Sequence, residues 1–374
     1  MWDRRRFMVA AGAAVLSPPA FAGARDGYSI ASYEGAMLID ALGGPGEFKP
    51  AESPNDTWSA RVIADARTSG LTAANVTVGE VGNGPHRFEE AVQGIARIDR
   101  EVQLHTESVL KVLSARDLRL AKSSRRLGLI YGFQDTSMLD GDLSRLNVFQ
   151  GLGVRIFQLT YNRRNLMGDG CIESADGGLS SLGHEAIIEL NGRSLLIDLS
   201  HAGPRTIAEG IAASKAPLAI THTGCRALVD SPRNVNDASL KALAEKGGVA
   251  GIYFMCFLRY LEQPHSEDVI RHLEHAVNVC GEDHVGIGTD SSISAMPLDA
   301  AFRAEHRKTI ADRIKAGISV AGESPEVLNV IPEYNSPLRF LTLADDLSRR
   351  GWSSGRIEKV LGANFVRLFG DVWS

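Results

Sequence analysis

The sequence has little of what would place it in several common classes of protein. It contains four cysteines in 374 residues and no Cys-x-x-Cys pair, which excludes a zinc ribbon and a dense disulfide framework. Its formal net charge of −5 gives no basic footprint for nucleic acid. The glycine-rich run at residues 43–46 has neither a lysine nor a dinucleotide fingerprint, so it predicts a turn rather than a phosphate site. A globular protein with four buried or free thiols is expected, and one or two disulfide bridges are the alternative in an oxidising compartment.

The first residues have the pattern of an export signal. Residues 3–8 read Asp-Arg-Arg-Arg-Phe-Met, and a weakly apolar run at 9–16 leads to the cleavage pattern Ala20-Phe21-Ala22. An arginine pair in this setting resembles a twin-arginine signal. The apolar run is shorter than the ~20 residues that span a bilayer. We therefore expect a signal over 1–22, the twin-arginine machinery as a partner and a periplasmic protein; an ordinary secretory signal or a retained anchor are the alternatives.

The rest of the chain alternates short apolar runs with longer amphipathic stretches. Continuous apolar runs of strand length are typical of strands buried on both faces of a parallel sheet. Eight of them, with helical patterns between, predict a (β/α)8 TIM barrel in one domain over residues 23–374. The expected strands are 36–40, 71–78, 127–133, 154–161, 195–200, 218–222, 248–254 and 285–290.

Apolar residues at three- and four-residue spacing predict the helices. They indicate helices over 86–113 and 266–279, with His272 and His275 on the surface of the second. From about residue 297 onward the chain is expected to form extra helices packed on the barrel. These are 299–316, 338–350 and 353–369, the last capped by Ser353 or Ser354.

Polar residues end several of the predicted strands, where active-site groups of a barrel stand. The strand Leu-Leu-Ile-Asp-Leu-Ser-His presents His201 at the rim, and Leu-Ala-Ile-Thr-His presents His222 beside it. Two neutral imidazoles from adjacent strands suit zinc. Asp290, at the end of Val-Gly-Ile-Gly-Thr-Asp, could ligate a metal or act as general base toward a metal-bound water.

The order of these motifs resembles the membrane (renal) dipeptidases, peptidase family M19. The carrying segments are Ile-Asp-Leu-Ser-His201, Thr-His222-Thr-Gly, Ser-Pro-Arg233-Asn-Val, Gly-Ile-Gly-Thr-Asp290, Gln158-Leu-Thr-Tyr-Asn162 and Gly362-Ala-Asn364. The resemblance implies a metallo-dependent hydrolase barrel with a two-zinc centre acting on dipeptides. It further implies that His201 and His222 hold one zinc, that Asp290 carries the proton, and that Arg233, Tyr161 and Asn162 contact the substrate. Family members often dimerise, so the resemblance also implies a homodimer.

The sequence departs from the family where the other zinc would bind. The first strand of the family ends Asp-Gly-His-x-Asp, whereas here it reads Asp40-Ala-Leu-Gly-Gly44. The bridging glutamate is replaced by Gln134, a neutral and weak ligand, and a substrate-contacting histidine by Tyr161. Because His, Asp and bridging Glu are lost together, the pattern predicts one divalent ion, held by His201, His222 and Gln134.

Three functions remain open on the sequence alone. The first is a one-metal hydrolase of a dipeptide or related small amide. The second is a metal-independent acid-base enzyme, such as a tautomerase tailoring an exported peptide-like metabolite, since a fold does not fix a function. The third is a non-catalytic binding protein that retains Arg233 to hold a carboxylate.

Overall fold

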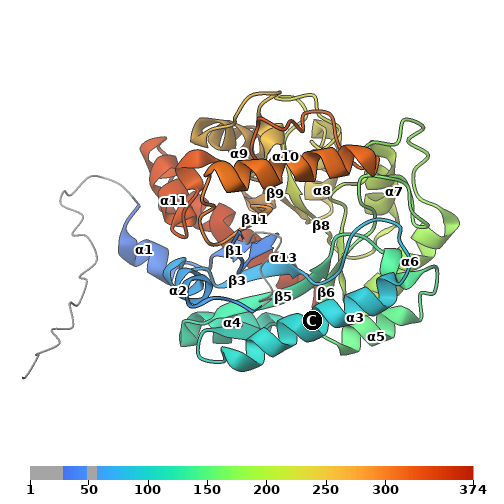
Figure 1. Ribbon diagram of the computed structural model, residues 1–374, viewed down its shortest axis with the longest axis horizontal. Coiled ribbons are helices and arrows are strands. Elements are labelled where there is room, and N and C mark those ends of the chain that lie inside the picture. Colours follow the sequence, from blue (N-terminus) through green and yellow to red (C-terminus); the bar gives the residue numbers. More distant parts are fainter. Residues whose placement is uncertain (1–27, 49–56, 374) are drawn as a thin grey trace, which may run out of the picture.

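A computed structural model describes residues 28–48 and 57–373, and the predicted signal at 1–22 lies outside them. Eight parallel strands form the main path of the sheet, in the order β1, β3, β5, β6, β7, β8, β9, β10 (Figure 1). Each predicted run overlaps one of them. Their bounds are β1 Ile39–Asp40, β3 Ala73–Thr77, β5 Leu127–Phe133, β6 Val154–Gln158, β7 Leu196–Asp198, β8 Ala219–Thr223, β9 Val249–Ile252 and β10 Val285–Ile287.

The first and last strands meet and close the barrel. Ala41 N–H donates to the Ile287 carbonyl at 2.9 Å. Below the mouth, the Asp40 carboxylate accepts from Thr289 N–H at 2.8 Å and from the Thr289 hydroxyl at 2.6 Å. Burial raises the pKa of Asp40 to about 7. The predicted (β/α)8 barrel is thus confirmed.

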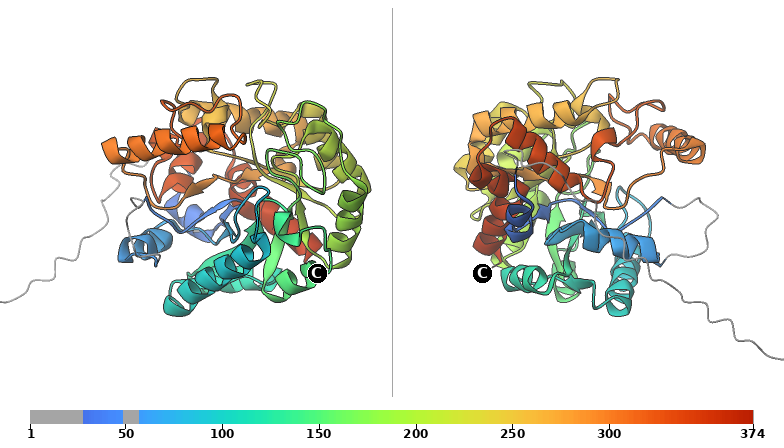
Figure 2. Two further views of the ribbon diagram at one scale, coloured as in Figure 1. Left: turned by 45° about the vertical axis from the view of Figure 1, so that its right-hand side comes forward. Right: turned by 90° about the vertical axis from the view of Figure 1, so that its left-hand side faces the viewer.

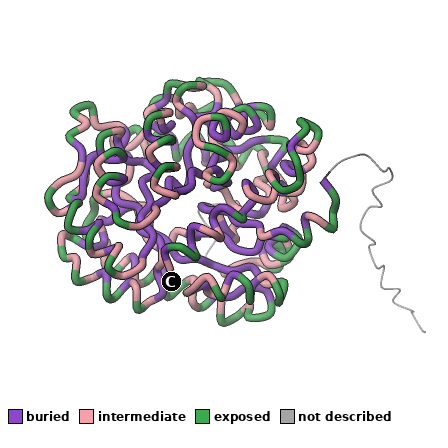
Figure 3. The backbone as a smooth tube through the Cα atoms, turned by 180° about the vertical axis from the view of Figure 1, so that it is seen from behind, coloured by how far each residue is buried: buried purple, intermediate pink, exposed green. Residues whose placement is uncertain are grey.

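Helices surround the strands, and exposed residues lie mainly on the outer helices (Figure 3). The helices between strands are α2 Ala60–Thr68, α3 Arg87–Leu104, α4 Ala115–Ser124, α5 Arg145–Gly151, α6 Ser181–Gly192, α7 Pro204–Ala213, α8 Asp237–Glu245 and α9 Ser266–Cys280. Those outside the repeat are α1 Ile30–Gly35, α10 Ala300–Lys315, α11 Arg339–Arg349, α12 Ser354–Glu358 and α13 Asn364–Val372. Within the described residues no helix is both long and apolar enough to cross a bilayer.

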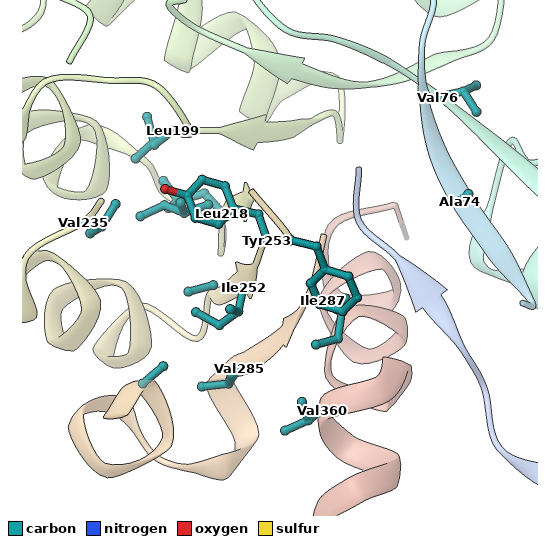
Figure 4. Close-up of a cluster of buried hydrophobic side chains, with 14 of the residues drawn as sticks. Ala74, Val76, Leu199, Leu218, Val235, Ile252, Tyr253, Val285, Ile287 and Val360 are labelled. Carbon is teal, nitrogen blue, oxygen red and sulfur yellow. The ribbon is translucent and has the colours of Figure 1, made fainter. Parts of the chain in front are cut away.

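Two hydrophobic clusters hold the layers together. The larger packs strands against the surrounding helices, and Figure 4 shows Ile252, Val285 and Ile287 of β9 and β10 together with Val360. The smaller fills the barrel interior, where Ile130 and Leu196 pack with Phe365 and Phe369 of α13. The C-terminal helix α13 therefore closes one end of the barrel. Figure 2 shows this helix, in red, beside the strands.

Two helices and the burial of one residue differ from the sequence expectations. The predicted helix at 86–113 ends at Leu104, and β4 (Val109–Lys111) follows it and pairs with β5. The predicted helix at 353–369 begins after its Ser353 cap as expected but is interrupted near Gly362, whose Cβ would lie 2.1 Å from the Met37 carbonyl. His272 is buried, because its Nδ1 accepts from Cys225 N–H at 2.9 Å. The prediction of a surface His272 was wrong.

Candidate active site

Two histidines face each other at the mouth of the barrel. His201 lies just after β7 and His222 lies in β8, and both are buried. Their Nε2 atoms are 2.9 Å apart. His201 has a left-handed backbone with φ of 62°. Such a conformation costs a non-glycine residue about 1–3 kcal/mol and tends to occur at functional sites. The structure therefore brings together the two imidazoles that the sequence singled out.

The hydrogen bonds behind the rings fix both tautomers. Asn162 Nδ2 donates to the Ile318 carbonyl at 2.8 Å, so Asn162 Oδ1 is the acceptor that faces His201 Nδ1 at 2.5 Å. The Thr221 hydroxyl donates to the Asp198 carboxylate, so its oxygen accepts from His222 Nδ1 at 2.8 Å. Since each neutral imidazole carries one N–H, both protons are on Nδ1. The two Nε2 lone pairs consequently point at each other.

Asp198 anchors this arrangement from inside the barrel. It also accepts from Ser200 N–H at 2.9 Å, the Ser200 hydroxyl at 2.7 Å and Thr221 N–H at 3.0 Å. Burial raises the pKa of Asp198, and the hydrogen bonds from Thr221 and Ser200 oppose that shift. Asp198 thus supports His222 through the Thr221 hydroxyl, whereas metal-ligating histidines usually have a carboxylate or carbonyl bonded to the ring directly.

The converging lone pairs fit one cation. Burial lowers the pKa of both His201 and His222, and the Arg233 cation lowers it further, so both rings are neutral. Two neutral Nε2 acceptors at this separation repel unless a cation lies between them. Within the described residues no three His, Cys, Asp or Glu side chains are grouped to hold a metal. The two imidazole nitrogens are of the kind that would hold a divalent ion.

Arg233 lies beside the histidines on the segment after β8. It is 3% exposed, and its Nη2 donates to the His222 carbonyl at 3.3 Å. Its guanidinium also lies over the Tyr253 ring, 5.3 Å from the centroid. Among the described residues, the guanidinium of Arg233 donates only to the His222 carbonyl. Its other N–H donors are therefore left for a ligand. A buried, undersatisfied guanidinium is suited to a carboxylate.

Asp290 follows β10, two strands from β8 in the order of the barrel. Its φ is 54°, and its N–H donates to the Leu42 carbonyl at 2.7 Å. Burial raises the pKa of Asp290, while Arg233 and Arg313 oppose the shift. Its carboxylate accepts no hydrogen bond among the described residues, so it is available to a substrate or a water.

The segment that follows β1 lines a cavity and carries no histidine. Gly43–Gly44 (β2) pair in parallel with Ser291–Ser292 (β11). A Cβ at Gly44 would lie 2.5 Å from Val76 Cγ1. These segments line a cavity of about 470 Å³ together with Gln134, Thr77 and Asp290.

The predicted site residues are not all in contact. Gln134 donates from Nε2 to the Thr77 hydroxyl at 2.9 Å, and within the described residues no hydrogen bond joins it to either histidine. Tyr161 stacks on His201, with ring centroids 4.2 Å apart, and Asn162 bonds to the same ring. The structure thus groups Tyr161, Asn162, His201, His222 and Arg233, while Gln134 lies with Asp290 along the cavity.

Sequence reasoning missed the residues behind the site. Asp198 could have been found, because in Ile-Asp-Leu-Ser-His it shares the inward face of its strand with Ser200. Arg313 and Glu323 gave no comparable signal, since their contact with the site depends on how α10 packs. All four cysteines are free.

Comparisons with known proteins agree with this geometry. The sequence model of the membrane dipeptidase family (peptidase family M19) matches residues 52–302. The solved structure of an amidohydrolase from Pseudomonas aeruginosa is 31% identical, with a TM-score of 0.78, over 92% of this chain and 98% of that one.

Curated sequences agree as well. An uncharacterized protein of the pqqA 5′ region of Klebsiella pneumoniae is 29% identical over 73% of this chain and 93% of its own length. Dipeptidase tcpJ of Claviceps purpurea is 26% identical over 78% of this chain and 64% of its own length, just under two thirds. The chain therefore belongs to the membrane dipeptidase family, whose members are hydrolases and in general zinc-dependent.

Proposed function

We propose that this protein hydrolyses a dipeptide or a related small amide with one divalent ion rather than two. The observation that carries the proposal is the pair of Nε2 lone pairs that converge from His201 and His222. Arg233 and Asp290 lie around them, so a cation site, a carboxylate site and a proton acceptor share one mouth. When bound, a zinc ion supplies Lewis acidity and lowers the pKa of its water toward 7.

The protein groups then have separate tasks. Arg233 binds the free carboxylate of the substrate through its spare N–H donors. Asp290 takes the proton of the attacking water and returns it to the leaving amine. Tyr161 stacks on the ring of His201 and contacts the substrate there. Asn162, expected from the family resemblance to contact the substrate, has its amide committed to His201 and Ile318 and therefore supports the ring instead. The cavity beside Asp290 and Gln134 has room for the other end of the substrate.

A metal-independent acid-base enzyme is the second candidate. The observation in its favour is the direct contact between two imidazoles, combined with the lack of a third ligand among the described residues. On this alternative His201, His222 and Asp290 would move protons within one substrate, as in a tautomerisation. Metal dependence separates the two candidates.

The test is a dipeptide screen with matched metal states. The protein is stripped with chelator, then assayed with zinc, manganese or cobalt against dipeptides that carry a free or an amidated C-terminus. We expect hydrolysis that requires the added ion and a free carboxylate, and that is lost in His201→Ala. Turnover that persists without metal would contradict the hydrolase and favour the second candidate.

Export, periplasmic location and dimerisation belong to the same proposal. The twin-arginine pattern at Arg4 and Arg5 supports export of a folded chain. Cell fractionation of the full chain and of an Arg4→Lys/Arg5→Lys variant tests it. We expect the wild-type protein in the periplasm and the variant in the cytoplasm.

A further inference from the structure

Arg313 reaches the mouth of the barrel from α10, outside the (β/α)8 repeat (Figure 1). Its Nε donates to Glu323 Oε2 at 3.0 Å and its Nη2 to Glu323 Oε1 at 2.6 Å. The Glu323 side chain is 3% exposed. A bidentate pair of this kind fixes the plane of the guanidinium. The remaining donors of Arg313 therefore have set directions.

One of these donors holds Tyr161. Arg313 Nη1 donates to Tyr161 Oη at 3.2 Å, across 152 residues of sequence. The Tyr161 ring in turn lies on His201 with an interplanar angle of 27°. Since a guanidinium has no acceptor, the phenol keeps its own O–H for another partner. Burial raises the pKa of Tyr161, so this partner meets a neutral donor.

A second donor shares a backbone acceptor with Asn162. Arg313 Nη2 also approaches the Ile318 carbonyl, at 3.5 Å. That carbonyl accepts from Asn162 Nδ2 and so decides which end of the Asn162 amide faces His201. Arg163 Nε supports the same segment through the Gly317 carbonyl at 2.6 Å. Two routes from Arg313 thus meet at His201, one through Tyr161 and one through Asn162.

We propose that Arg313, held by Glu323, is a positioning residue that fixes the orientation and the Nδ1–H tautomer of His201. Without it, Tyr161 loses its anchor and the Asn162 amide can turn. His201 then samples the tautomer with its proton on Nε2, which cannot ligate through that atom. The proposal rests on the proposed function for its purpose, but its structural content does not need a metal.

The test compares Arg313→Gln with Arg307→Gln, a matched charge change at an exposed position of the same helix. Nitrogen-15 spectra of histidine-labelled, metal-free protein report the tautomer of each ring. We expect one Nδ1–H form of His201 in the wild type and in Arg307→Gln, and a mixture in Arg313→Gln. Zinc affinity should fall ~10–100-fold in Arg313→Gln, the usual effect of losing a partner behind a metal ligand. Arg313→Lys should restore part of it.

A second variant keeps the test decisive if Arg313→Gln does not fold. Glu323→Gln retains Arg313 but removes the carboxylate that orients it, and should give the same mixture with a smaller loss of affinity. An unchanged His201 spectrum and a zinc affinity within about twofold of wild type, in a folded variant, would overturn the proposal. If the wild type itself binds no zinc, the proposed function fails, while the tautomer spectra still decide the role of Arg313.

Discussion

The mouth of the barrel has two unlike halves. At β7 and β8, each imidazole is backed by a hydrogen-bonded partner, Asn162 for His201 and Thr221 with Asp198 for His222. At β1 and β5, the corresponding rim consists of the Gly43–Gly44 backbone paired with Ser291–Ser292, and of the neutral Gln134. On the proposed function, the first half holds the cation. The second half lines the cavity beside Gln134, and its backbone pairing closes it only to a second ion.

The difference shows that a metal site depends on the groups behind the ligands as much as on the ligands. His201 and His222 expose lone pairs only because their other nitrogens are held as donors. Leu42 and Gly44 stand where the family's first strand has its ligating side chains, and a side chain at Gly44 would overlap Val76. On this account, restoring ligating side chains at positions 42 and 44 would not by itself create a second metal site, because the side chain at position 44 would also need space.

The largest effect is expected at Asp290, the proposed proton acceptor. Asp290→Asn removes the base without removing a histidine, so kcat should fall about 10²–10⁴-fold, the contribution of a positioned general base. Zinc affinity should stay close to wild type, since Asp290 is not grouped with the histidines. Steady-state kinetics and zinc titration measure both. A large loss of affinity would instead make Asp290 a ligand.

Arg233→Gln should weaken substrate binding on the cation-holding half. A hydrogen bond to a charged group contributes about 1.5–3 kcal/mol, so KM for a dipeptide with a free carboxylate should rise ~10–100-fold. The amidated dipeptide, already a poor substrate, should change little. Equal losses for both substrates would show that Arg233 acts on the site rather than on the carboxylate.

Gly44→Ala tests the closed half. Its Cβ would overlap Val76, and φ is 154°, so we expect a loss of about 1–3 kcal/mol of unfolding free energy, typical of overpacking. Gly35→Ala is the control, because no atom lies within 4 Å of its added Cβ. Denaturant unfolding measures the loss. Zinc affinity should be unchanged; a change would mean that the two halves are coupled.

The smallest expected effect is a shift in pH dependence. A base must be ionised, so kcat/KM should fall as pH drops through the pKa of Asp290. Burial raises that pKa, and the Arg233 cation opposes the rise. The acid limb should therefore lie above the usual aspartate range, and Arg233→Gln should move it further up. An acid limb that moves down in this variant would contradict the assignment of the base.

The sequence predicts the strands and the residues at their ends better than it predicts contacts that depend on packing. The strands could be predicted because their two-sided burial leaves continuous apolar runs, and strand-end positions located His201, His222 and Asp290. The break at Gly362 and the position of β4 depend on packing that periodicity does not record. Arg313 lies on a helix with few buried residues, and its contact with Tyr161 follows from tertiary structure alone.

The most direct test of the comparison is metal stoichiometry. Protein loaded with excess zinc and freed of unbound ion should contain close to one zinc per chain by elemental analysis. The His201→Ala/His222→Ala variant should contain none, and Gln134→Glu should still contain one. Two ions per wild-type chain would contradict the account of the closed half, and no ion would contradict the account of the histidine pair.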